Sequence, residues 1–171
     1  PNKKMLSHGN NDIDDYIDLF VNIIFFLKNK NENIFLLNHE GIGDHKICEI
    51  INSKIPEPIE IVSYSSAKEI KGVIGNSKLT ISSRFHGVAS SLSQGVPCLA
   101  TSWNHKYEML FKSFDQQDCV LNVNDKIEIN LNIVYNMYQN IETNKTKLQN
   151  RKQIFINQTN LMWDTIFEKM L

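Results

Sequence analysis

Apolar residues follow two different spacings along the chain, and the two spacings alternate. Ile13, Ile17, Phe20 and Ile24 lie three or four residues apart, which is the spacing of one face of a helix. Residues 34–37, by contrast, are all apolar between polar neighbours, a pattern typical of a strand buried on both faces of a parallel sheet. The same two patterns recur through most of the chain, so the sequence predicts alternating helices and strands.

Local signals add the boundaries of these elements. Ser66 and Glu69 have the spacing of a capping box at a helix start, and Gly75 and Gly95 stand where helices end. The predicted helices cover residues 12–28, 44–53, 66–75, 87–94, 106–114, 130–142 and 146–170, and the predicted strands cover 34–37, 59–62, 79–82, 98–101 and 119–123. Because single helices separate the strands, we expect an α/β fold with an open, doubly wound, Rossmann-like parallel sheet and helices on both faces.

Composition narrows the class of protein. A length of 171 residues predicts a single domain, and a net charge of −1 with 22% charged residues gives no reason to expect a nucleic-acid partner. The sequence shows neither an 18-residue apolar run nor a signal peptide, which predicts no transmembrane segment. Cys48, Cys98 and Cys119 are odd in number and form no C-x-x-C pair. We therefore expect the cytoplasm, with the inner face of the membrane as an alternative.

Polar residues that can do chemistry follow three of the predicted strands. In open α/β sheets, ligands bind at the carboxyl ends of the strands, so three loops should converge on one edge of the sheet. The residues in these loops are His39 after the first strand, Ser83, Arg84 and His86 after the third, and Ser102, Asn104, His105 and Lys106 after the fourth.

Arg84 is the centre of this predicted site. It precedes a short helix expected to begin near Gly87, and a helix N-terminus beside an arginine favours an anion such as a carboxylate or phosphate. The alternative is that Arg84 only pairs with a carboxylate of the protein. His86 can bind an anion or deliver a proton near neutral pH. His105 and Lys106 are candidates at the same edge, or they only belong to the start of an exposed helix. His39 is a further candidate, or it serves as a plain hydrogen-bond donor at the end of a strand.

Other catalytic patterns fit the sequence poorly. The zinc-protease motif would need a histidine where the chain has Gly43, which leaves His39, Asp44 and His45 as a weak metal set. The serines near Gly95 lack the first glycine of a nucleophile elbow. A dinucleotide-binding or phosphate-loop pattern does not occur.

The segment ISSRFHGVASSLSQGVPCLATSWNHKYEML, residues 81–110, resembles the signature of the polysaccharide pyruvyl transferase family. The matching positions are Ser83-Arg84-Phe85-His86, Gly95-Val96-Pro97 and Asn104-His105-Lys106. Two positions depart from the family pattern, because Phe85 stands where leucine is usual and Asn104 where aspartate is common.

This resemblance implies a two-domain enzyme of the GT-B type that transfers a pyruvyl group from phosphoenolpyruvate to hydroxyls of a cell-surface polysaccharide or its precursor. The chain, residues 1–171, would be the C-terminal half, and the N-terminal domain that binds the glycan or lipid-linked sugar acceptor would be missing. The scheme needs no metal or other cofactor. The implied donor-binding residues are His39, Ser83, Arg84, His86 and Lys106. His86 is the first choice for the general acid, and His105 is the second.

Two other functions remain open from the residues alone. A GT-B glycosyltransferase domain would bind a nucleotide sugar at the same strand ends, and Glu108 is the nearby carboxylate for its ribose hydroxyls. A non-catalytic binding module would keep the fold without the reaction. Binding of phosphoenolpyruvate or of a nucleotide sugar distinguishes these possibilities.

Overall fold

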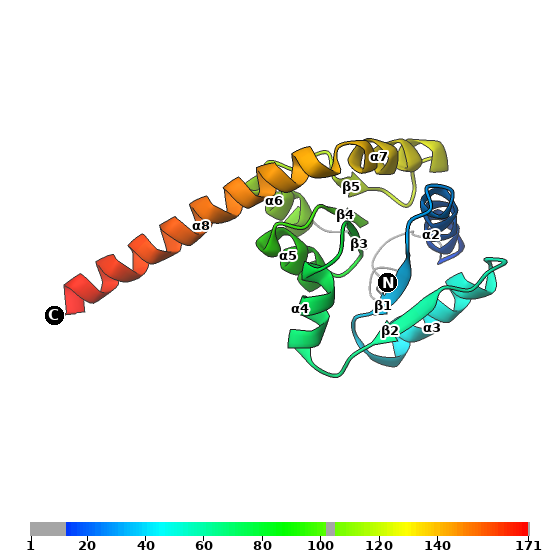
Figure 1. Ribbon diagram of the computed structural model, residues 1–171, viewed down its shortest axis with the longest axis horizontal. Coiled ribbons are helices and arrows are strands. Elements are labelled where there is room, and N and C mark those ends of the chain that lie inside the picture. The colour runs from blue at the N-terminus through cyan, green and yellow to red at the C-terminus, as the bar shows by residue number, and fades with distance from the viewer. Residues whose placement is uncertain (1–12, 102–104, 171) are drawn as a thin grey trace.

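The computed structural model describes residues 13–101 and 105–170. Its elements alternate between helices and short strands, as the sequence predicts (Figure 1). In chain order they are α2 (Ile13–Lys28), β1 (Phe35–Asn38), α3 (Gly41–Ser53), β2 (Glu60–Ser63), α4 (Ala67–Gly75), β3 (Thr80–Ser82), α5 (Phe85–Gln94), β4 (Cys98–Thr101), α6 (His105–Ser113), β5 (Val120–Leu121), α7 (Ile127–Gln139) and α8 (Ile141–Met170).

The strands form two parallel sheets instead of the single sheet expected. One contains β1 and β2, with Leu36 opposite Ile61, and the other has the order β3-β4-β5, with Ile81 opposite Leu99. The predicted positions and parallel direction of the strands are confirmed. Backbone pairing stops between β1 and β3, where a cavity lies between the two strands.

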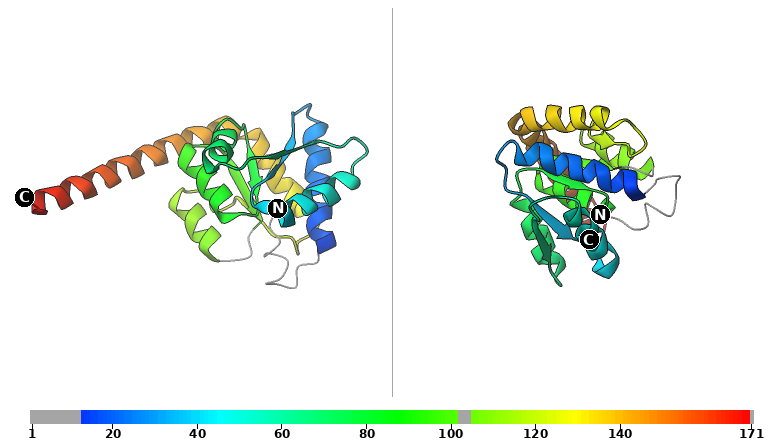
Figure 2. Two further views of the ribbon diagram at one scale, coloured as in Figure 1. Left: turned by 90° about the horizontal axis from the view of Figure 1, so that it is seen from below. Right: turned by 90° about the vertical axis from the view of Figure 1, so that its right-hand side faces the viewer.

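The helices fall into two groups around the strands. Helix α2 contacts α3 and α7, whereas α4 contacts α5, and α5 contacts α8. Figure 1 shows α4 and α5 on the side of the strands away from α2 and α3, and Figure 2 gives the same arrangement from two other directions. The described fold is therefore mixed α/β, with the strands between helices.

Several boundaries differ from the prediction in a way that affects the site. Helix α3 begins at Gly41 instead of residue 44. Gly41 itself has a φ of 71°, which turns the chain into the helix. Helix α5 begins at Phe85 instead of residue 87. These earlier starts place Asp44 and His86 inside the first turn of their helices.

Strand β4 and its neighbours form the core. Every residue of β4 is buried, which explains its uninterrupted run of small and apolar residues. Leu99 packs in one cluster with side chains from α5, α6 and β5, namely Val88, Leu92, Tyr107, Phe111 and Leu121.

The three cysteines are free and buried. Burial raises the pKa of Cys98 to about 11 and that of Cys119 to about 12. Both side chains are therefore neutral thiols near pH 7, and they act as small apolar residues of the core.

Helix α8 extends far beyond the rest of the fold (Figure 1). The sequence predicted a break between residues 142 and 146, but α7 ends earlier and α8 runs without interruption from Ile141 to Met170. Ile141 and Leu148 are buried, and the ring of Phe155 packs at a tilt against that of Phe114 with centroids 5.0 Å apart. The last part of the helix is exposed, and its large apolar residues are Leu161, Met162, Trp163, Ile166, Phe167 and Met170.

Among the described residues, no helix is both long enough and apolar enough to cross a membrane. Helix α8 has the length, but polar and charged side chains alternate with its apolar ones.

Gly95 offers a test of the turn that ends α5. It has a φ of 77°, and an added Cβ would lie 3.2 Å from Cγ of Gln149. Gly95→Ala should lower the free energy of unfolding by about 1–2 kcal/mol, the cost of a left-handed backbone for a residue with a Cβ. Urea denaturation measures the change.

Gly72, inside α4, is the matched control, because an added Cβ would have no neighbour within 4 Å. Gly72→Ala should raise the free energy of unfolding by roughly 0.5–1 kcal/mol. Equal effects of the two substitutions would contradict the assigned backbone at Gly95.

Candidate functional site

The turn from β3 into α5 is fixed by its own side chains. Ser82 accepts a hydrogen bond on Oγ from the backbone N–H of Arg84, at 3.1 Å. Arg84 keeps an extended backbone, and its carbonyl accepts the first bond of α5 from the N–H of Val88. The side chain of Arg84 thus leaves the chain where the strand ends and the helix begins.

Gly87 brings this helix start close to the end of β1. An added Cβ at Gly87 would lie 2.6 Å from Oγ of Ser82 and 3.7 Å from Cδ2 of His39. A larger residue would push α5 away from both strands. The loop after β1 and the loop after β3 therefore meet, as the sequence predicts for residues at strand ends.

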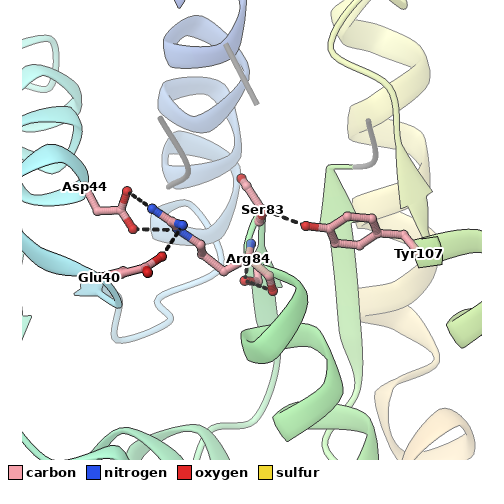
Figure 3. A network of polar contacts seen from close by, with 6 residues as sticks. Glu40, Asp44, Ser83, Arg84 and Tyr107 are labelled. Atoms are coloured by element: carbon pink, nitrogen blue, oxygen red, sulfur yellow. Dashed lines mark hydrogen bonds and ion pairs between the residues drawn. The ribbon is translucent and has the colours of Figure 1, made fainter. Parts of the chain in front are cut away.

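Arg84 points from this turn toward α3, where it meets two carboxylates (Figure 3). Asp44 accepts from Nε at 2.9 Å and from Nη2 at 2.6 Å, so this pair is bidentate. Glu40 accepts from Nη1. Asp44 is fully buried, while the Glu40 side chain is 66% exposed. The carboxylate pairing considered from the sequence is thus present in the structure.

Ser83 lies behind the turn, fully buried. Its Oγ is 2.6 Å from the Tyr16 hydroxyl and accepts a hydrogen bond from Thr101 Oγ1 at 2.7 Å. Its carbonyl accepts from the Tyr107 hydroxyl at 2.9 Å (Figure 3). Side chains from α2, β4 and α6 therefore hold the backbone that carries Arg84.

Two of the predicted residues of the next loop, His105 and Lys106, lie at the start of α6. Lys106 sits over the ring of Phe85, with Nζ 4.7 Å from the centroid, which is a cation–π contact between the starts of α6 and α5. His105 is exposed, with Nδ1 2.9 Å from Oε2 of Glu108. Ser102 and Asn104, also singled out from the sequence, lie outside the described residues.

The other two histidines have different surroundings. His86 is exposed in the first turn of α5, edge-on to the ring of Phe85. His39 is half-buried, and its pKa is lowered first by desolvation and then by the positive charge of Arg84. His39 is therefore held toward its neutral form in the fold.

A cavity of about 510 Å³ lies between β1 and β3. Apolar side chains such as Leu36 and Ile81 line most of it, and His39, Ser82 and Arg84 line it near the carboxyl ends of the strands. The predicted residues His39 and Arg84 thus share one cavity. The arrangement can hold a small molecule whose charged end faces Arg84.

In the described part of the chain, no group of three histidine, cysteine or acidic side chains is placed to hold a metal ion. In the weak metal set considered from the sequence, Asp44 binds Arg84 and His45 faces Glu49.

The carboxylate partners of Arg84 were not predicted from the sequence. Glu40 directly precedes α3 and Asp44 belongs to its first turn, so the predicted helix start at residue 44 left no reason to group the two carboxylates. No local sequence pattern predicts the roles of Tyr16 and Tyr107, because each contacts Ser83 from a distant part of the sequence.

The fold and the site together define a parallel-stranded α/β protein that gathers polar side chains where its strands end. The family model for polysaccharide pyruvyl transferase matches residues 1–105, well over half of the chain. The chain belongs to the polysaccharide pyruvyl transferase family. The match includes the Ser83–His86 and Gly95–Pro97 motifs and ends at His105. No curated protein and no solved structure matches the chain significantly.

The buried pair of Arg84 and Asp44 leads to a prediction about stability. Arg84→Ala should lower the free energy of unfolding by about 3–5 kcal/mol, because it leaves a buried carboxylate without its partner. The double variant with Asp44→Ala should be less destabilised than the sum of the two single variants. Urea denaturation of all four proteins measures this coupling, and simple additivity would contradict it.

His39 leads to a prediction about pH. Since its pKa is lowered in the fold, the unfolded chain takes up this proton first as the pH falls, so the contribution of His39 to stability decreases between about pH 7 and pH 5. His39→Gln should remove that part of the pH dependence. Urea melts across this range compare the two proteins, and identical slopes would show that His39 titrates normally.

Proposed function

We propose that this chain supplies the donor-binding part of an enzyme that transfers a pyruvyl group from phosphoenolpyruvate to hydroxyls of a cell-surface polysaccharide or its precursor. The observation that carries the proposal is the turn from β3 into α5. There Arg84, the start of a helix and His86 lie together at the end of a strand, and Arg84 also lines the cavity. Family membership supports pyruvyl transfer in general.

The architecture of the whole enzyme is part of the proposal. We interpret the alternating elements as a doubly wound, Rossmann-like C-terminal half of a GT-B enzyme. The acceptor, a glycan or lipid-linked sugar, would then bind to a separate N-terminal domain. A chain of this kind binds the donor by itself but needs the other domain for turnover, and the reaction takes place in the cytoplasm or at the inner face of the membrane.

Phosphoenolpyruvate has two anionic groups, a carboxylate and a phosphate. The guanidinium of Arg84 and the first N–H groups of α5 suit one of them. His39 lies on the other side of the same turn, near Gly87, and Lys106 is close by, over Phe85. Ser83 positions Arg84 in this scheme, because hydrogen bonds to its buried hydroxyl and carbonyl hold the backbone of Arg84 in place.

The reaction balances as an addition followed by loss of phosphate. A proton adds to the methylene carbon, and an acceptor hydroxyl attacks the adjacent carbon. A second hydroxyl then replaces phosphate to close the ketal. The two acceptor hydroxyls release two protons. One replaces the proton that the general acid gave to the methylene carbon, and the other leaves with phosphate. His86 is the proposed general acid because it is exposed beside the helix start, and His105 is the second choice.

A nucleotide-sugar site is the competing proposal. It would use Glu108 for the ribose hydroxyls, but this carboxylate is paired with His105. Calorimetry with phosphoenolpyruvate and with uridine diphosphate glucose separates the two functions. Binding of the nucleotide sugar alone would overturn pyruvyl transfer, and binding of neither would favour a non-catalytic module.

Arg84→Lys tests the donor site without removing the charge that balances Asp44. A lysine cannot form the forked contact, so affinity for phosphoenolpyruvate should fall by about 1.5–3 kcal/mol, the range for hydrogen bonds to charged groups. Arg151→Lys is the matched control, because Arg151 binds the carbonyl of Ser113 and the carboxylate of Asp115. Unchanged affinity in folded Arg84→Lys would remove Arg84 from the donor site.

His86→Ala tests the proton transfer in the enzyme with its acceptor domain. Turnover at saturating phosphoenolpyruvate should fall by about 10²–10⁴-fold if His86 is the general acid, whatever His86 contributes to donor affinity. Full turnover in this variant, together with loss of turnover in His105→Ala, would move the role to His105.

A further inference from the structure

The two carboxylates around Arg84 are held in different ways. Asp44 is fully buried, belongs to the first turn of α3 and takes two hydrogen bonds on one edge of the guanidinium. Glu40 precedes the helix, has a side chain that is mostly exposed and pairs with Nη1. An exposed ion pair contributes little to stability, whereas a buried bidentate pair is costly to break.

Among the described residues, the guanidinium of Arg84 pairs with two carboxylates, and the charge of Asp44 is by itself enough to neutralise it. A negatively charged ligand that approaches Nη1 therefore meets the like charge of Glu40. If Glu40 moves away into solvent, the negative charge of the ligand takes the place of the Glu40 carboxylate beside Nη1. Asp44 stays paired with Arg84.

The backbone allows this movement at small cost. Glu40 lies between the end of the β1 loop at His39 and Gly41, whose φ of 71° turns the chain into α3. The exposed side chain can change rotamer without any change in the helix. Asp44 cannot do the same, because its side chain is fully buried and accepts two hydrogen bonds from Arg84.

We propose that Glu40 sets the affinity of the donor site, because it pairs with Nη1 of Arg84 in this structure and is displaced by a charged group of the donor. Asp44 remains in place and acts as the positioning residue for Arg84. This inference rests on the proposed binding of phosphoenolpyruvate at Arg84. It assigns to Glu40 a role opposite to that of a binding residue, since its removal strengthens binding.

Glu40→Gln tests the inference, because glutamine keeps the size and an acceptor oxygen but removes the charge. The variant should bind phosphoenolpyruvate about three- to tenfold more tightly in calorimetry, the size expected for removing one exposed like charge nearby. In the enzyme with its acceptor domain, the donor KM should fall while kcat stays the same. Glu49→Gln is the control, since Glu49 is an exposed residue of α3, the helix that follows Glu40, and faces His45.

The outcomes separate this inference from the proposed function. Unchanged or weaker binding in folded Glu40→Gln, when the unsubstituted protein binds phosphoenolpyruvate, would overturn the role of Glu40 alone. Inorganic phosphate serves as a second probe. Tighter phosphate binding by Glu40→Gln without any binding of phosphoenolpyruvate would support Glu40 and overturn the proposed donor. Failure of both anions to bind any of the proteins would overturn both proposals.

Discussion

Asp44 is a fully buried carboxylate, and Arg84 is the cation that balances its charge. Removing either partner would leave an uncompensated charge in the interior, which costs far more than a surface ion pair gives. The pair also joins two parts of the fold that share no strand pairing, because Asp44 belongs to α3, beside β1, and Arg84 leads from β3 into α5 (Figure 3). Arg84 is therefore both a structural link and the proposed centre of donor binding.

The small polar residues around Arg84 have a structural explanation that complements the functional one. Ser82 fixes the turn, Ser83 is held by hydroxyl groups from three other elements, and Gly87 lets the helix approach His39. Such a rigid backbone places a guanidinium with little loss of entropy when a ligand binds. In the described structure, the charge that follows this core strand is balanced by the carboxylates of Asp44 and Glu40.

Pyruvyl transfer requires a protein that binds a small, highly charged donor and delivers a proton to carbon. The cavity between β1 and β3 is mainly apolar, with Arg84 and His39 near the carboxyl ends of those strands. His86 is exposed at the start of α5. In the proposed arrangement, half-buried groups would orient the donor and an exposed group would transfer the proton.

The sequence by itself determined the elements whose signals are local. The apolar runs located the strands, the Ser83–His86 motif located the turn after β3, and Gly95 located the end of α5, because periodicity, strand ends and left-handed turns depend on neighbouring residues. Only the tertiary structure decided that the strands form two sheets, that α3 begins at Gly41 and that Arg84 pairs with Asp44 and Glu40. These features depend on contacts between residues some 40 positions apart in the chain, and the partner of a charged side chain is chosen by burial and packing, which no local pattern specifies.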